Sequence, residues 1–150
     1  MIPRRFLRRL LIAPVLFAAI TVSACDDSPL TPAPAFTQTD LRVGTGATAA
    51  TGNTLTVQYT GWLYDGSRPD QKGLQFESNV GGTAFQFVLG TGRVIAGWDQ
   101  GLVGIQAGGI RRLVIPPELA YGPIRRGAIP PDSTLVFEVE VTAVDVPSGQ

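Results

Sequence analysis

A short apolar segment that contains two glycines constrains the fold more than any other part of the chain. Four apolar residues follow the spacing i, i+3, i+7 and i+10, which places them on one face of a helix over about residues 95–104: Ile95, Trp98, Leu102 and Ile105. Gly97 and Gly101 fall within this helix, although glycine costs about 1 kcal/mol relative to alanine at a helical site. Close approach of a strand or a ligand would account for both glycines. We therefore expect a weak helix that lies against a sheet.

Most of the remaining pattern indicates strands. Apolar and polar residues alternate over residues 55–59 and 135–141, as in antiparallel strands that are buried on one face. Residues 85–89 and 111–115 predict two further strands, and residues 41–43 predict an edge strand. About 110 residues are enough for one domain with a single core. Several strands and one short helix predict an α+β domain in which the sheet covers the helix.

The first 24 residues are expected to be a signal peptide. Four arginines precede an apolar run over residues 10–22, which is short for a membrane span. Cys25 is the only cysteine, so no intramolecular disulfide can form. The residues that end in Cys25 (22–25, Val-Ser-Ala-Cys) look like a bacterial lipobox, in which the cysteine becomes a lipidated N-terminus. Two or more acyl chains would hold the protein at a membrane, and the alternative is a secreted protein with an unmodified cysteine.

The rest of the chain divides into a tether, a domain and a tail. Residues 25–37 contain three prolines and few apolar side chains, so we expect a flexible, proline-rich tether after the lipidated cysteine. Residues 38–146 form the predicted domain, and residues 147–150 a disordered tail. Four of the 12 basic residues lie in the signal peptide, which leaves 8 basic residues against 12 acidic ones. This balance argues against a nucleic-acid partner.

Seven short motifs resemble, in the same order, those of the FK506-binding-protein (FKBP) family of peptidyl-prolyl cis/trans isomerases. They lie at residues 57–61, 76–78, 85–90, 94–98, 120–122, 129–131 and 135–139. The resemblance covers roughly residues 38–146. It implies a bent antiparallel sheet of about five strands wrapped around one short helix. It also implies an enzyme that isomerises X-Pro bonds and that FK506- or rapamycin-type macrolides inhibit.

The residue composition agrees with chemistry that needs neither proton transfer nor a cofactor. Histidine is absent, Cys25 is assigned to lipidation, and no cluster has the spacing of metal ligands. Rotation about an X-Pro bond meets these conditions, because its barrier of about 18–20 kcal/mol comes from amide resonance. An apolar pocket disfavours the planar, charge-separated amide, and a hydrogen bond to the twisted carbonyl stabilises the transition state. No cofactor and no metal are expected.

The resemblance also implies the site residues. The catalytic set would be Tyr59, Phe76, Glu77, Ile95, Trp98, Tyr121 and Phe137. The further residues that contact substrate or macrolide would be Phe85, Val94, Ala128 and Ile129. Trp98 would form the floor under the prolyl ring, and the Ile95 N–H and the Tyr121 hydroxyl would donate to substrate carbonyls. We expect Phe87, on the same strand face as Phe85, to be a core residue.

Several positions depart from the family pattern around the pocket rim. Glu77 stands where the most active members have aspartate, Arg93 replaces an acidic residue, and Ala128 is smaller than the usual isoleucine. The loop over residues 122–129 is one residue short, and residues 67–74 add a longer, bulged connection. These changes affect the expected specificity and rate but not the expected fold.

Two functions are compatible with these residues. The first is a monomeric, lipid-anchored isomerase of the bacterial cell envelope, on the periplasmic or extracellular face, that acts on X-Pro segments of exported polypeptides. The alternative is a weakly active chaperone or peptide-binding module that retains the pocket. The aromatic residues favour the enzyme, and Glu77 favours the alternative.

Overall fold

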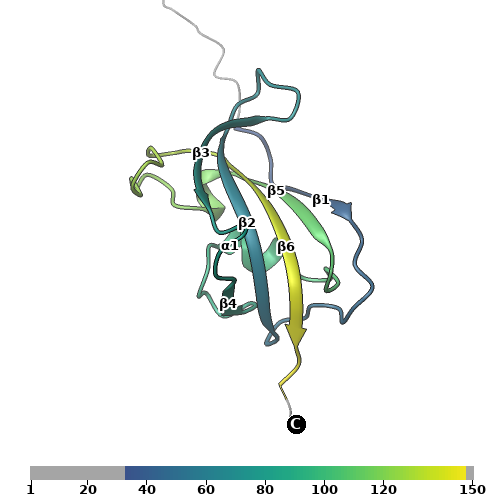
Figure 1. Ribbon diagram of the computed structural model, residues 1–150. Helices are drawn as coiled ribbons and strands as arrows, with labels where there is room; N and C mark the ends of the chain where they lie inside the picture. The colour runs from purple at the N-terminus through teal and green to yellow at the C-terminus, as the bar shows by residue number, and fades with distance from the viewer. Residues whose placement is uncertain (1–32, 148–150) are drawn as a thin grey trace, which may run out of the picture. The chain divides into compact units, whose positions relative to one another are not determined.

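The computed structural model describes residues 33–147. The predicted signal peptide, Cys25 and most of the predicted tether lie outside these residues. In chain order the elements are β1 (Thr37–Arg42), β2 (Thr54–Tyr64), β3 (Lys72–Ser78), β4 (Phe85–Val88), α1 (Ala96–Gly101), β5 (Ile110–Ile115), the 3-10 helix η1 (Pro117–Leu119) and β6 (Leu135–Asp145) (Figure 1). The prediction of an α+β fold with one short α-helix is confirmed.

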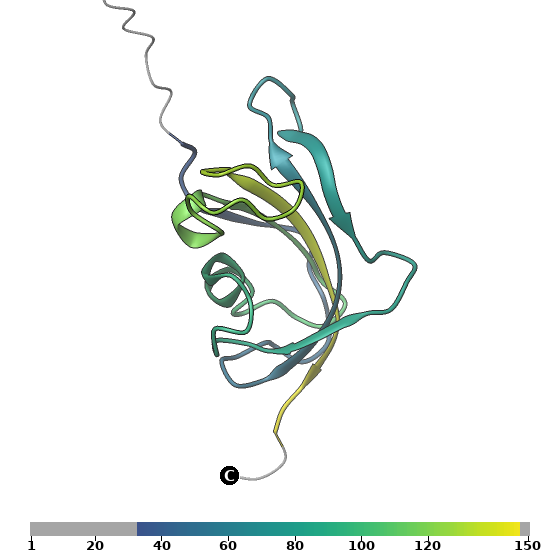
Figure 2. The same ribbon diagram turned by 90° about the vertical axis from the view of Figure 1, so that its left-hand side faces the viewer.

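All strands in residues 33–147 belong to one antiparallel sheet with the order β1-β5-β6-β2-β3. Strand β4 pairs with the first part of β2, on the same edge to which β3 pairs farther along. The sheet is bent, and both α1 and η1 lie on its concave side (Figure 2). The long strands β2 and β6 follow the expected alternation, since Leu55, Val57, Val139 and Val141 are fully buried. These residues form one core with Leu113 and Ile115 of β5, Leu102 and Ile105 after α1, and Trp98 and Phe137.

The sheet has six strands rather than about five, because part of the expected bulged connection is strand β3. Its pairing with β2 shifts register twice, between Gly61 and Trp62 and between Trp62 and Tyr64. Strand β3 has only two large apolar residues, Leu74 and Phe76, so its sequence does not mark a buried face as the sequences of the longer strands do. Strand β1 also begins and ends earlier than the predicted edge strand at 41–43, and all of its residues are exposed.

The helix is shorter than predicted, but its glycines have a structural explanation. Helix α1 ends at Gly101, although Leu102 remains fully buried. A Cβ atom on Gly97 would lie 2.5 Å from Cγ2 of Ile115, and one on Gly101 would lie 2.7 Å from Cδ2 of Leu113. Both neighbours belong to β5. Of the two explanations offered for the glycines, close approach of a strand is therefore correct.

A buried arginine completes the end of α1. Arg111 of β5 is only 6% exposed, and its Nη1 donates to the carbonyls of Gly101 (2.8 Å) and Val103 (2.9 Å). Its Nε and Nη2 donate to the two carboxylate oxygens of Asp40 on β1, at 2.5 and 3.1 Å. The guanidinium group thus satisfies helix-end carbonyls that lack partners within the helix. It joins the edge strand, β5 and α1 through one side chain.

Candidate functional site

A cavity of about 320 Å³ lies within the concave side of the sheet. Its volume is within the range typical of small-molecule sites, about 300–1,000 Å³. The lining comes from β2, β3, β4, α1, β6 and the segments before α1 and after η1: Tyr59, Glu77, Phe85, Arg93, Val94, Ile95, Trp98, Tyr121 and Phe137. Eight of these nine are residues that the sequence assigned to the site, and the ninth is Arg93.

Aromatic rings fix the shape of this cavity. Trp98 is 4% exposed, and its ring meets those of Tyr59 and Phe137 nearly edge-on, at centroid distances of 5.0 and 5.3 Å. Phe87 packs against the same indole at 5.7 Å and is itself buried, as expected of a core residue. Edge-to-face contacts of this kind add about 0.5–1.5 kcal/mol each beyond the burial of area. The indole is therefore held in place by packing before any ligand arrives.

The Ile95 N–H and the Tyr121 hydroxyl at this cavity have no acceptor among residues 33–147, and neither does the buried Trp98 Nε1. The Ile95 carbonyl accepts from the N–H groups of Trp98 (2.9 Å) and Asp99 (3.2 Å), but the Ile95 N–H itself donates to none of the described residues. The Tyr121 hydroxyl, in the segment that follows η1, likewise makes no hydrogen bond within the described part of the chain. Both donors can therefore bind the carbonyl groups of a ligand.

The turn before α1 positions the Ile95 amide. The Asp99 carboxylate accepts hydrogen bonds from the N–H groups of Gly90 (2.7 Å) and Gly92 (2.8 Å). Both glycines have positive φ angles, 78° and 70°, which favour glycine over other residues. Asp99 was not predicted as a site residue, although the two glycines before it are a signal of a tight turn.

Burial and one carboxylate set the charge state of the tyrosines. Partial burial raises the pKa of Tyr59 well above its usual value, and interaction with the Glu77 carboxylate raises it further. Burial also raises the pKa of Tyr121; Glu77 adds to this shift and Arg126 opposes it. The Arg126 guanidinium lies 5.7 Å from the centre of the Tyr121 ring. Both hydroxyls are thus protonated donors at neutral pH.

Three predicted site residues lie outside the lining of this cavity. Phe76 of β3 packs behind it, with its ring 5.6 Å from that of Phe137 and nearly perpendicular to it. Ile129 is buried in the core, and Ala128 is exposed in the loop that follows Tyr121. Phe76 therefore supports the wall through its contact with Phe137, while Ile129 belongs to the core and Ala128 to the adjacent loop.

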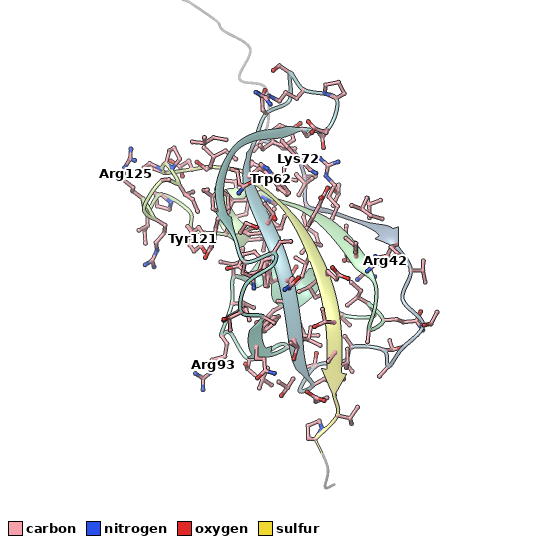
Figure 3. All side chains as sticks on the ribbon, viewed as in Figure 1. Arg42, Trp62, Lys72, Arg93, Tyr121 and Arg125 are labelled. Carbon is pink, nitrogen blue, oxygen red and sulfur yellow. The ribbon has the colours of Figure 1, made fainter. Side chains whose placement is uncertain are left out.

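Arg93 is the lining residue that the site prediction left out. It is exposed and projects from the turn beside β4, while Arg125 projects from the loop after Tyr121 (Figure 3). From the sequence, Arg93 was identified only as a departure from the family pattern. Within residues 33–147 no group of three or more histidine, cysteine or acidic residues could hold a metal ion. No helix in the same residues is long and apolar enough to cross a membrane.

Comparison with known proteins agrees with this geometry. The model of the family described as FKBP-type peptidyl-prolyl cis-trans isomerase matches residues 46–142. FK506-binding protein 2 of Yarrowia lipolytica is 50% identical over 101 residues, which are 65% of this chain and 64% of that protein. FK506-binding protein 4 of Neurospora crassa is 45% identical over 105 residues, which are 70% of this chain and 21% of that protein. The chain thus spans less than two thirds of these relatives.

Two solved structures are similar over most of the described chain. The crystal structure of AtFKBP13 superimposes with a TM-score of 0.61 at 36% identity, over 72% of this chain and 91% of that one. The crystal structure of FkpA from Escherichia coli gives the same TM-score at 39% identity, over 73% of this chain and 48% of that one.

Proposed function

This chain belongs to the FKBP-type peptidyl-prolyl cis-trans isomerase family, and we propose that its cavity catalyses rotation about X-Pro bonds of polypeptide substrates. The observation that carries the proposal is the buried Trp98 indole, which Tyr59 and Phe137 hold edge-on at the base of a cavity of about 320 Å³. A prolyl ring is flat and apolar enough to lie on this surface.

The residues around the cavity suggest how the barrier falls. Amide resonance contributes a barrier of about 18–20 kcal/mol, and the resonance is lost as the bond twists. Aromatic walls exclude water and so disfavour the planar, charge-separated amide. The free Ile95 N–H and the Tyr121 hydroxyl can donate to substrate carbonyls and hold the twisted geometry. Glu77, an exposed residue of the cavity lining, can accept a hydrogen bond from the Tyr59 hydroxyl and so orient that side chain.

The test is isomerisation of short X-Pro peptides by the purified protein, with and without an FK506-type macrolide. We expect catalysis that the macrolide inhibits, and loss of both macrolide binding and most of the activity in Trp98→Ala. Because Trp→Ala in a core costs about 3–5 kcal/mol, unfolding is measured alongside. Full activity in a folded Trp98→Ala protein would exclude the cavity as the site.

The same measurement separates the enzyme from a binding module. Glu77 carries its carboxylate one methylene farther from the backbone than aspartate would, and displacements of about 1 Å can cost about 10²-fold in an ordered site. A protein that bound the macrolide but did not accelerate isomerisation would be a chaperone or peptide-binding module.

We further propose that the protein acts in a bacterial cell envelope and is anchored through lipid on Cys25. The support is the basic and apolar leader, the lipobox-like residues 22–25 and the proline-rich residues before the domain. Its substrates would then be the X-Pro segments of exported polypeptides.

Labelling with a tagged palmitate tests the anchor. We expect wild-type protein to label and to sediment with membranes, and Cys25→Ala to do neither. Labelling and sedimentation of the Cys25→Ala protein would place the anchor elsewhere.

A further inference from the structure

A second hollow adjoins the cavity along strand β4. Its volume is about 400 Å³, and its lining consists of Thr54, Phe85, Gln86, Phe87, Val88 and Arg93. Phe85 and Arg93 also line the first cavity. Phe85 and Arg93 therefore border both hollows, so a chain bound in the first could extend past these two residues toward the second.

One main-chain edge of β4 is open within the described residues, because β4 pairs only with β2. Leu89 directly follows β4. Its N–H donates to the Asn53 carbonyl (2.9 Å) and its carbonyl accepts from the Gly52 N–H (2.9 Å), so both groups face the residues that lead into β2. The main-chain N–H and C=O groups of successive residues point to alternate edges of a strand. Those of Phe87 therefore point toward β2, and those of Gln86 point toward the open edge. The Gln86 N–H and carbonyl are thus placed to pair with an extended peptide.

The side chains beside this edge have a distinct chemistry. Phe85 is 41% exposed and stacks on Phe87 at 5.6 Å, so it offers an apolar surface. No salt bridge joins Arg93 to a carboxylate in residues 33–147, and the four salt bridges there involve other basic residues. Arg93 is therefore a free cation that lines both hollows. Its side chain projects outward from the ribbon (Figure 3).

From this arrangement we propose that the second hollow is an extension of the substrate site. The chain that flanks the substrate proline leaves the first cavity over Phe85, pairs with the main chain of Gln86, and places an acidic side chain against Arg93. This inference rests on the proposed isomerase function and adds a substrate preference to it. The preferred substrates are extended segments with a glutamate or aspartate a few residues from proline.

The experiment compares two matched sets of peptides with the purified protein. One set is short, with a single residue on each side of X-Pro. The other extends both sides and carries either glutamate or lysine at the third residue before or after proline. The readouts are the glutamate-to-lysine ratio of kcat/KM and the same ratio of binding constants from fluorescence anisotropy. Ratios cancel any general effect of a substitution on the cavity.

We expect glutamate to be preferred about two- to fivefold on one side of proline, the range that an exposed ion pair supplies. The preference should vanish in Arg93→Gln, reverse in Arg93→Glu and shrink at high salt. Arg125→Glu is the matched control, because it changes the net charge equally but lies on the loop after Tyr121 (Figure 3). It should keep the preference. N-methylation of the extended peptide's amides should weaken binding, while the short peptides show no effect of Arg93.

Two results would overturn the extension site. One is an equal glutamate-to-lysine ratio in wild type and Arg93→Glu. The other is an equal loss of the glutamate preference in Arg125→Glu and Arg93→Glu, which would indicate an effect of net charge rather than of a specific contact. Absence of catalysis on every peptide would instead contradict the proposed function. In that case the ratio of binding constants still decides whether the second hollow recognises acidic segments.

Discussion

Replacement of Gly97 by alanine tests the contact between α1 and β5. The added Cβ would lie 2.5 Å from Cγ2, 2.8 Å from Cδ1 and 3.0 Å from Cγ1 of Ile115. Carbon atoms in favourable contact are about 3.5–4.0 Å apart. Ile115 is fully buried, so it has little room to move, and α1 is expected to shift away from the sheet.

The size of the effect follows from two opposing terms. Alanine gains about 1 kcal/mol of helix propensity over glycine. Overpacking of a core costs about 1–3 kcal/mol, and contacts as short as 2.5 Å place this site at the upper end. We therefore expect Gly97→Ala to lower the free energy of unfolding by about 2 kcal/mol. Trp98 is the next residue, so macrolide affinity should fall as well.

A double-mutant cycle with Ile115→Ala measures this contact by urea denaturation. Ile115→Ala alone should cost about 2–5 kcal/mol. In that background the clash is absent, and Gly97→Ala should become stabilising by about 1 kcal/mol, which gives a coupling of about 3 kcal/mol. Gln100→Ala, at an exposed position of the same helix, is the control and should change stability little. The reasoning is refuted if Gly97→Ala stabilises the wild-type protein or if the coupling is absent.

Three further predictions concern the cavity and its support. Tyr121→Phe should lower kcat/KM about three- to tenfold with little change in stability, as loss of one hydrogen bond predicts. Because burial raises the pKa of Tyr121, wild-type activity should be retained through the pH range in which an unperturbed tyrosine loses its proton. Glu77→Asp should raise kcat/KM and Glu77→Gln should lower it; equal activity in all three proteins would exclude a role for the carboxylate. Asp40→Ala should destabilise by about 1–3 kcal/mol, less than a fully buried pair, since the Asp40 side chain is 40% exposed. Arg111 lowers the pKa of Asp40, so this contribution is present above pH 4 and is lost as the pH falls through the folded-state pKa, which acid denaturation of wild type and variant would show.

The elements that the sequence predicted are those with regular periodicity. Strands β2 and β6 alternate apolar and polar residues over most of their length, and the face of α1 follows a helical spacing. Strand β3 was missed because it has only two large apolar residues, Leu74 and Phe76, and Leu74 is exposed, so its sequence marks no buried face. The glycines of α1 indicated a close neighbour, but only the packing of the helix on β5 identifies that neighbour as Ile115 and Leu113.

The residues of the candidate site likewise fall into those that could be predicted from the sequence and those that could not. The aromatic positions could be assigned because they occur in short motifs with fixed order. The exclusion of Ala128 and Ile129 from the lining could not be predicted, because it depends on how a loop folds over the sheet. Arg93 and Asp99 were missed as site residues because their roles depend on the turn between β4 and α1.

The bridge from Asp40 through Arg111 to the end of α1 has a mechanical consequence. Strand β1 is an edge strand with exposed side chains, and it is the first element after the residues that lead into the domain. Tension applied through those residues loads β1 before any other strand. While β1 remains paired, Arg111 holds the Asp40 carboxylate of β1 and the carbonyls of Gly101 and Val103 together. Force on the leading segment would thus be transmitted to the helix that carries Trp98, so stretching this protein should weaken ligand binding before the sheet unfolds.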